Sequence, residues 1–344
     1  MNVLAIETSC DETALAVVSN KGTIHASTIY SQFPEHAAYG GVVPEIAART
    51  HLTKLPTLLE KTLGEAELSL KDIDAICATA GPGLIGGLLV GLNYAKALAF
   101  SLEKPFYSIN HLAGHALSVR LHETVAFPYM LLLVSGGHTQ LIVVHSSSRF
   151  TLLGESRDDA AGETFDKTAK LLGLPQPGGP NIEKWALSGN AHAYNFPHPF
   201  ANESHCDFSF SGLKTAVRTC IANTSENEKA NIAASFQRTV AEILYERSCQ
   251  ALATCSIQKI PVKSFVIAGG VAANNFIRNA LIKLEKKFQI SCIFPPISLC
   301  TDNAAMIAWA CIEQIRDGSA TPNMRAAATP RWPLNQLNRE GTTK

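Results

Sequence analysis

The chain has 344 residues, of which 46% are hydrophobic and 17% charged, and its formal net charge is zero. This composition excludes a disordered chain, and the length predicts two domains that can each bury a core. No apolar run reaches the roughly 18 residues of a transmembrane helix, so we expect no membrane partner. The nine cysteines contain no C-x-x-C pair and the first residues are typical of a strand, not a signal peptide, so we expect a cytoplasmic protein.

The first third of the chain predicts a three-stranded meander that is followed by alternating helices and strands. Apolar runs and turn residues predict strands over residues 3–7, 14–18, 23–31, 73–78 and 105–109, with helices over 44–65 and 84–102.

This order partly repeats from residue 129. The expected strands cover residues 129–134, 140–145, 150–154, 262–268 and 291–294, and the expected helices cover 160–172, 181–187, 212–222, 230–255, 275–287 and 303–316. Strands that alternate with helices, with a meander at the start of each half, predict an α/β protein of two related lobes. The cleft between such lobes is the expected functional site.

Two histidines, His111 and His115, stand four residues apart in an expected helix over residues 111–121. This spacing places both side chains on one helix face, with Cβ atoms roughly 5–6 Å apart, where they can share one divalent metal ion. We expect the third ligand to be Asp302, which precedes the last helix. From the two histidines alone, polar residues on a solvated helix face are an equal alternative.

Three turns rich in small residues, at 135–139, 178–181 and 269–274, lie next to predicted strands or helices. Glycine lacks a Cβ, so the backbone N–H groups of such turns can approach an anion closely. Each turn alone is more typical of a structural role. Together with an acidic turn at Asp11 and Glu12, the three turns indicate a nucleotide site, although neither a P-loop nor a dinucleotide-binding motif is present.

Two further segments allow two interpretations each. Residues 158–167 are acidic and open a helix, so they either complement the helix dipole or let Asp166 accept hydrogen bonds from a ribose. Residues 208–215 mix aromatic side chains with Lys214, which is compatible with core packing or with substrate contact.

Five segments, taken in order, resemble one family. They are residues 7–13, 110–115, 133–139, 208–215 and 269–274. Over about residues 1–331 the chain is similar to the TsaD family of tRNA N6-adenosine threonylcarbamoyltransferases, which were formerly described as O-sialoglycoprotein endopeptidases. The resemblance implies an actin-like (ASKHA, RNase H-like) α/β fold of two related lobes with a nucleotide and metal cleft between them. We expect residues 1–110 and about 303–330 in the N-terminal lobe, and residues 111–302, with helical insertions, in the C-terminal lobe.

The resemblance also implies the site residues. One divalent metal ion per subunit, iron(II) in preference to zinc, would bind to His111, His115 and Asp302. The adenylate substrate would contact Val134, Ser135, Gly136, Gly137, His138, Asp166, Gly179 and Asn274. We expect Asp11 and Glu12 to orient the acceptor or to assist removal of its proton.

The implied reaction transfers the threonylcarbamoyl group from threonylcarbamoyl-AMP to N6 of the adenosine 3′ of the anticodon, in tRNAs that read codons beginning with A. The implied partners are tRNA, a TsaB-like paralogue and a TsaE-like ATPase.

Three other functions are compatible with parts of the sequence. An ATP-dependent small-molecule kinase of the same fold would need only Mg²⁺ held by oxygen ligands, so it does not explain the histidine pair. A zincin-type metalloprotease would need a glutamate between the histidines, where this chain has Leu112, Ala113 and Gly114. A non-catalytic interaction subunit would not need His111, His115 and Asp302.

Overall fold

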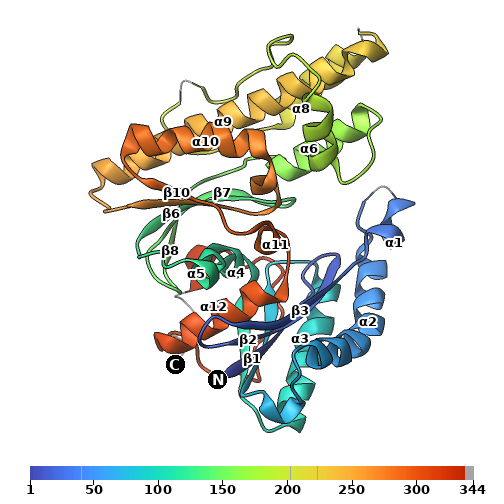
Figure 1. The fold of residues 1–344 in the computed structure, drawn as a ribbon, viewed down its shortest axis with the longest axis vertical. Helices are drawn as coiled ribbons and strands as arrows, with labels where there is room; N and C mark the ends of the chain where they lie inside the picture. Colours follow the sequence, from blue (N-terminus) through green and yellow to red (C-terminus); the bar gives the residue numbers. More distant parts are fainter. Residues whose placement is uncertain (40, 202, 223, 338–344) are drawn as a thin grey trace. The chain divides into compact units, whose positions relative to one another are not determined.

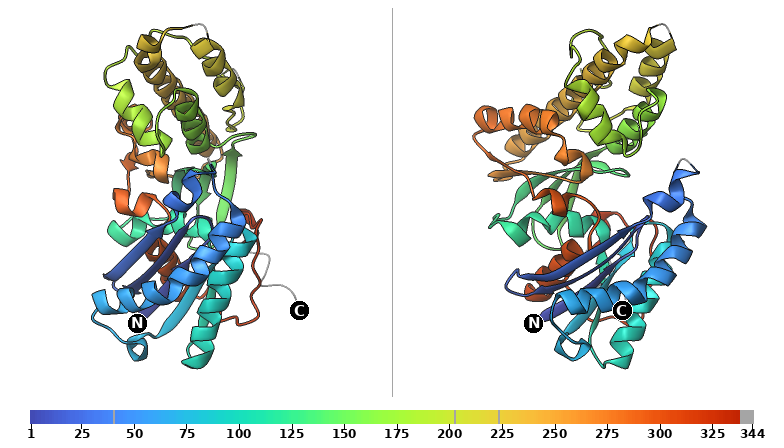
Figure 2. Two further views of the ribbon diagram at one scale, coloured as in Figure 1. Left: turned by 90° about the vertical axis from the view of Figure 1, so that its right-hand side faces the viewer. Right: turned by 45° about the vertical axis from the view of Figure 1, so that its right-hand side comes forward.

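The computed structural model describes residues 1–39, 41–201, 203–222 and 224–337. The chain divides into two units, which Figures 1 and 2 show from three directions. The first unit comprises Met1–Thr124, Ser146–Phe150 and the chain from Asp302 onward, and the second comprises Val125–His145 and Thr151–Thr301. The lobe boundaries predicted from the sequence stay a prediction, as does the cleft between the lobes.

The first unit is built on a five-stranded sheet in the order β3-β2-β1-β4-β5. Its strands are β1 (Asn2–Glu7), β2 (Glu12–Ser19), β3 (Ile24–Ser31), β4 (Ala75–Gly81) and β5 (Phe106–Asn110). The strands β1, β2 and β3 form an antiparallel meander, and β4 and β5 extend it in parallel to β1. The central strands β1 and β4 are buried along nearly their whole length, as expected for a sheet with helices on both faces.

Helices cover both faces of this sheet (Figure 1). Helices α2 (Pro44–Glu65) and α3 (Ile85–Ser101) share one hydrophobic cluster with the sheet, which includes Leu4, Leu15, Leu55 and Leu92. Helix α12 (Ala304–Arg316) contacts all five strands from the other face. The short elements of this unit are α1 (Phe33–Ala37), η1 (Leu70–Asp72), α4 (His111–Leu117) and α5 (Val119–His122).

The second unit repeats this sheet. Its order is β10-β9-β6-β7-β8, with strands β6 (Tyr129–Val134), β7 (Thr139–Val144), β8 (Phe150–Glu155), β9 (Ser264–Ala268) and β10 (Ser291–Ile293). The strands β6 and β7 are antiparallel, while β9 runs parallel to β6 and β10 runs parallel to β9. Both sheets therefore have three strands consecutive in the chain, extended by two parallel strands beside the first of them. The internal duplication predicted from the element order is confirmed.

Helices also surround the sheet of the second unit. They are α6 (Ala161–Leu171), α7 (Gly178–Ala186), α8 (Ser211–Ala222), η2 (Glu226–Glu228), α9 (Lys229–Ile257), η3 (Gly270–Ala273), α10 (Asn275–Phe288) and α11 (Ile297–Cys300). Their core includes Leu132 and Phe265 from the sheet and Phe165 and Phe236 from α6 and α9. Among the described residues, no helix is both long and apolar enough to cross a membrane.

Some of the predicted elements differ from the structure. The expected helix over 111–121 is broken into α4 and α5 at Ser118, whose hydroxyl donates to the carbonyl of His115 and competes with the helical hydrogen bonds. Helix α7 begins at Gly178, so the expected turn at 178–181 is its first turn. The helices α1 and α11 were missed, because elements this short carry no helical period.

Helix α3 approaches the turn after β1 so closely that it excludes side chains at two positions. A Cβ atom at Gly87 would lie 2.3 Å from the carbonyl oxygen of Thr8, and one at Gly91 would lie 2.0 Å from the Thr8 hydroxyl oxygen. That hydroxyl donates to the carbonyl oxygen of Gly87 over 2.9 Å. The glycines of α3 therefore fix the position of the turn that leaves β1.

This contact predicts opposite effects of the same substitution at two helical glycines. Gly87→Ala should lower the free energy of unfolding by about 1–3 kcal/mol, because the new methyl group meets backbone. Gly64→Ala, in α2, should raise it by about 0.5–1 kcal/mol, because no atom lies within 4 Å of the added Cβ and alanine restricts the unfolded chain. Urea unfolding of both variants measures this, and a stabilised Gly87→Ala variant would contradict the close approach.

Candidate functional site

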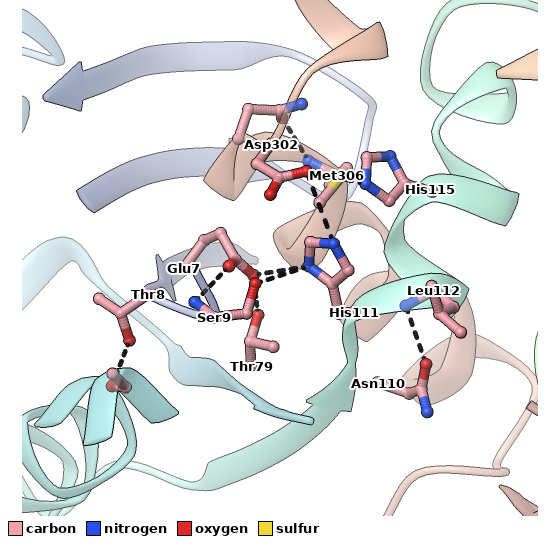
Figure 3. Close-up of polar contacts among 12 residues, drawn as sticks. Glu7, Thr8, Ser9, Thr79, Asn110, His111, Leu112, His115, Asp302 and Met306 are labelled. Atoms are coloured by element: carbon pink, nitrogen blue, oxygen red, sulfur yellow. Dashed lines mark hydrogen bonds and ion pairs between the residues drawn. The ribbon is translucent and has the colours of Figure 1, made fainter. Parts of the chain in front are cut away.

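The carboxyl ends of three neighbouring parallel strands bring functional side chains to one edge of the first sheet (Figure 3). Glu7 ends β1, Thr79 lies near the end of β4, and His111 follows β5 directly. Strand β4 lies between β1 and β5, and all three run in the same direction. This edge of a parallel sheet is where α/β proteins place their ligands.

Helix α4 presents the two predicted histidines. The side chain of Asn110 caps the helix by accepting hydrogen bonds from the N–H groups of Leu112 and Ala113, at 2.9 and 3.2 Å. The helix therefore begins at His111, and His115 lies one turn further on. Their rings meet edge to face, with centroids 4.7 Å apart. Both histidines are buried.

Asp302 reaches this pair because α12 packs closely against α4. A Cβ atom at Gly114 would lie 2.7 Å from the Cδ1 atom of Ile307, so the glycine between the two histidines permits the approach. Asn303 caps α12 by accepting a hydrogen bond from the N–H of Met306 over 2.9 Å. The cap leaves Asp302 immediately before the helix, beside α4 (Figure 3).

The side chains of His111, His115 and Asp302 fit one metal ion. Their ligand atoms all lie within 4.8 Å of one another. Oδ1 of Asp302 is 3.0 Å from Nε2 of His115 and 3.5 Å from Nε2 of His111. The Nδ1 atom of His115 is buried and has no hydrogen-bond partner in the part of the chain that the structure describes. Two imidazoles and one carboxylate form a donor set that suits iron or zinc.

The acidic surroundings change the pKa values of two groups. Burial would lower the pKa of His111, but the carboxylates of Asp302 and Glu7 outweigh it and raise this pKa to about 9. Burial, together with the charges of Asp11 and Asp302, raises the pKa of Glu12 to about 9. Without a metal ion, both groups therefore hold a proton at neutral pH. A bound cation would replace the positive charge that these protons supply to the acidic surroundings.

Asp11 and Glu12, predicted to assist catalysis, lie in and just after the turn between β1 and β2. The backbone of this turn is held from two sides: the imidazole of His51 contacts the carbonyl of Cys10 over 3.0 Å, and the N–H of Gln32 donates to the carbonyl of Asp11. Both acidic side chains are partly exposed. The structure therefore places them in the same unit as the three candidate ligands.

In the second unit, the turn after β6 leaves its backbone open. The N–H of Ser135 donates to the carbonyl of His138, and the N–H of His138 donates back to the Ser135 hydroxyl. A Cβ atom at Gly136 or Gly137 would meet nothing within 4 Å, so packing does not require glycine at either position. An exposed turn without side chains is suited to contact with an anion.

Asp166 and Gly179 are brought together at the start of α7. Oδ1 of Asp166 accepts a hydrogen bond from the N–H of Gly178 over 2.7 Å, and a Cβ atom at Gly178 would collide with Asp166. Gly179, the next residue, is partly exposed and has no neighbouring atom within 4 Å of a built Cβ. The carboxylate thus accepts a hydrogen bond at the start of α7, a different helix from α6, which the acidic segment opens.

Both polar atoms of the Asn274 side chain form hydrogen bonds within the protein. Its Oδ1 atom accepts from the N–H of Ile277 and caps α10, and its Nδ2 atom donates to Gln237. Beside it lies a hollow of about 600 Å³. The residues that line the hollow are Pro180, Glu183, Lys184, Ala186, Leu187, Gly189, Ala191, Ala234, Gln237, Asn275, Phe276 and Asn279.

Sequence reasoning missed Glu7 and Thr79. Glu7 is 1% exposed and lies 3.2 Å from the Nδ1 atom of His111. The available signal was a carboxylate at the end of an otherwise apolar strand. This signal could be interpreted only with the strand order, which places Thr79 and His111 beside Glu7. The sequence does not state that order.

Solved structures define the class of protein. Over 92% of this chain and 48% of the other, the fold matches HypF from T. kodakarensis with a TM-score of 0.64 at 15% sequence identity. Component A of the (R)-2-hydroxyglutaryl-CoA dehydratase of Acidaminococcus fermentans matches over 91% of this chain and 99% of the other, with a TM-score of 0.54 and 16% identity. The chain thus has the predicted actin-like α/β fold, with one mixed sheet in each unit.

Sequence comparison defines the family. The family model of TsaD, tRNA N6-adenosine threonylcarbamoyltransferase, matches residues 23–309. Proteins of this name from Rhizobium etli and Brucella anthropi are 51% and 50% identical to the chain; the alignments cover 97% and 98% of this chain and 94% and 96% of those proteins. The chain belongs to the TsaD family.

The raised pKa of His111 predicts a pH-dependent metal affinity. Below its pKa of about 9, a metal ion must displace a proton from the imidazole. The dissociation constant for Co²⁺ should therefore fall by up to about tenfold per pH unit as the pH rises from about 7 to about 9. Calorimetric titration in buffers of different ionisation enthalpy measures the constant and the released proton. An affinity independent of pH, without proton release, would contradict the assignment.

Proposed function

We propose that the chain transfers the threonylcarbamoyl group from threonylcarbamoyl-AMP to N6 of the adenosine 3′ of the anticodon, in tRNAs that read codons beginning with A. The products are N6-threonylcarbamoyladenosine in tRNA and AMP. The observation that carries this proposal is family membership, with about 50% identity to named transferases over nearly the whole chain.

The reaction needs positioning more than it needs a strong base. The donor is a mixed carbamic–phosphoric anhydride with AMP as a good leaving group, whereas the exocyclic amine of adenine is a weak nucleophile. Holding the two together in the correct orientation removes a large part of the barrier.

We assign His111, His115 and Asp302 as the ligands of one divalent ion, iron(II) in preference to zinc. The convergence of their ligand atoms supports this assignment. When bound there, the ion supplies Lewis-acid activation and a template for the threonylcarbamoyl end of the donor. The three side chains leave further coordination positions for substrate, as catalytic metal sites do.

In our proposal, the second unit holds the AMP part of the donor. The open turn of Val134, Ser135, Gly136, Gly137 and His138 offers backbone N–H groups to the phosphate, which is supported by glycines that packing does not require. Asp166, Gly179 and Asn274 contact the nucleoside. The hollow of about 600 Å³ beside Pro180 and Asn275 supports a nucleoside site there.

Asp11 and Glu12 are proposed to orient the acceptor or to assist removal of its proton. A carboxyl group with a pKa of about 9 keeps its proton at neutral pH, so Glu12 is not a base in the metal-free protein. A cation at the neighbouring histidines lowers the pKa of this carboxyl group and gives it the ionised form that a base requires.

The partners are proposed from the family resemblance: tRNA as acceptor, a TsaB-like paralogue and a TsaE-like ATPase, with the cytoplasm as the compartment. The kinase alternative is not favoured, because the relatives carry the transferase name and because Mg²⁺ sites of kinases use oxygen ligands where this set offers two imidazoles.

The central prediction concerns transfer and its dependence on metal. The purified chain, with TsaB-like and TsaE-like proteins added, should transfer threonine label from threonylcarbamoyl-AMP to unmodified tRNA. A chelator or the variant Asp302→Ala should lower the rate by at least about a hundredfold, because the third ligand or the ion is lost. His122→Ala is the matched control, since this histidine is exposed on the neighbouring helix α5 and should leave transfer unchanged.

Two results of this experiment would revise the proposal in different ways. Absence of label on tRNA with all proteins present would contradict the transferase. Transfer that persists with chelator and in the Asp302→Ala variant would retain the transferase and remove the metal ion from the reaction.

The proposed phosphate contact of the turn at Gly136 and Gly137 predicts that a substitution there weakens substrate binding without lowering the stability of the protein. Gly137→Val should leave the thermal midpoint unchanged, because its side chain enters open space. It should weaken binding of threonylcarbamoyl-AMP about ten- to a hundredfold, because one or two hydrogen bonds to a charged phosphate are blocked. The comparison is Gly162→Ala, whose Cβ would lie 2.5 Å from the carbonyl oxygen of Ser135 and should lower the midpoint. Unchanged affinity in Gly137→Val would contradict the phosphate role.

A further inference from the structure

We propose that Glu7 is a positioning residue for the metal centre: it holds the Nδ1 proton of His111 and thereby leaves the Nε2 atom as the metal ligand. This inference rests on the proposed metal site. It assigns a role to a buried carboxylate that is not itself one of the three ligands.

The two nitrogens of His111 face different partners (Figure 3). Nδ1 lies 3.2 Å from Oε2 of Glu7 and 3.2 Å from the hydroxyl oxygen of Ser9. Nε2 points the other way and lies 3.5 Å from Oδ1 of Asp302. The edge of the imidazole ring that carries Nε2 is therefore the edge directed at Asp302 and the shared ligand position.

The Glu7 carboxylate is fixed as an acceptor on both oxygens. Its Oε1 atom accepts from the N–H of Ser9 over 2.7 Å. Its Oε2 atom accepts from the hydroxyl of Thr79 and lies 3.2 Å from the Nδ1 atom of His111. Because Glu7 is 1% exposed, water does not compete for these oxygens. An acceptor in this position requires a proton on Nδ1, which selects one imidazole tautomer.

The carboxylate is also held in place by the sheet. Glu7, Thr79 and His111 come from the ends of β1, β4 and β5, which are consecutive neighbours in the sheet. Side chains anchored on three paired strands have little freedom to reorient. In contrast, the Nδ1 atom of His115 has no hydrogen-bond partner among the described residues, so there this carboxylate support is specific to His111. Partners of this kind in other metal sites typically contribute about ten- to a hundredfold in metal affinity.

Substitution of Glu7 by glutamine leaves one of its hydrogen-bond donors without an acceptor. Both oxygens accept hydrogen bonds, but the amide offers only one oxygen. If this oxygen accepts from Ser9, the NH₂ group faces the Nδ1–H of His111; if it accepts from His111, the NH₂ group faces the N–H of Ser9. In either orientation, the support of the Nδ1–H tautomer is weakened without a change in side-chain volume.

The first test measures metal affinity in the full chain. Metal-free wild type, Glu7→Gln and Glu7→Asp are titrated with Co²⁺ in competition with a chelator, and binding is followed by visible absorption. We expect both variants to bind about ten- to a hundredfold more weakly. The matched control is Glu313→Gln: Glu313 is also buried in the first unit, where Arg120 pairs with it at 2.6 Å, and this variant should bind Co²⁺ like wild type.

The second test reads the tautomer of His111, and its deciding measurement is made on the wild-type chain. In the zinc-loaded wild-type chain labelled with ¹⁵N-histidine, two imidazoles should shift on addition of zinc. One of them, His111, should show a metal-bound Nε2 and an Nδ1 proton protected from exchange, and this protection should be lost in Glu7→Gln. Zinc bound through Nδ1 of His111 would overturn the proposal.

Neither test uses tRNA or threonylcarbamoyl-AMP, so the outcomes separate two failures. Wild-type affinity in both Glu7 variants would overturn the role of Glu7 and leave the proposed transferase untouched. Failure of the wild-type chain to bind Co²⁺ would overturn the role of Glu7 together with the metal site on which it rests.

Discussion

The pairing of a buried carboxylate with a buried imidazole is the interaction on which the first unit is organised. Glu7 and His111 meet because β1, β4 and β5 run in parallel and end at the same edge. Neither side chain would be stable there alone, since an unpaired buried charge is costly. Close packing around this pair holds its neighbours in place. The glycines of α3 fix the turn after Glu7, and Gly114 allows α12 to bring Asp302 against the two histidines.

The duplication explains why functional residues occur at equivalent places with different chemistry. In each unit, the turn between the first two strands of the meander carries candidate site residues. In the first unit this turn leads to Asp11 and Glu12, which lie in the same unit as the candidate metal ligands. In the second it contains Gly136 and Gly137, whose open backbone suits an anion. One topology thus offers two equivalent turns, and their sequences give them different charge: one carries two carboxyl groups and the other two glycines.

Most of the fold could be predicted from the sequence, because apolar runs, turn residues and element order record strands and helices directly. The His111 and His115 pair could be predicted as well, since i,i+4 spacing is a local property of a helix. The place of Glu7 could not, because it depends on β4 lying between β1 and β5. The break at Ser118 was missed because it depends on one side-chain hydrogen bond. Asn274 was predicted only as a substrate contact, and its use as a helix cap became visible only from its partners.

X-ray absorption spectroscopy of the zinc-loaded chain tests the metal centre most directly, because it identifies the atoms around the ion. The account predicts a first shell of nitrogen and oxygen at about 2.0–2.1 Å, with the outer-shell scattering of two imidazoles. It predicts no sulfur, because the three candidate ligands are two histidines and one aspartate. A sulfur shell at about 2.3 Å, or a first shell without imidazole, would contradict a centre built on His111, His115 and Asp302.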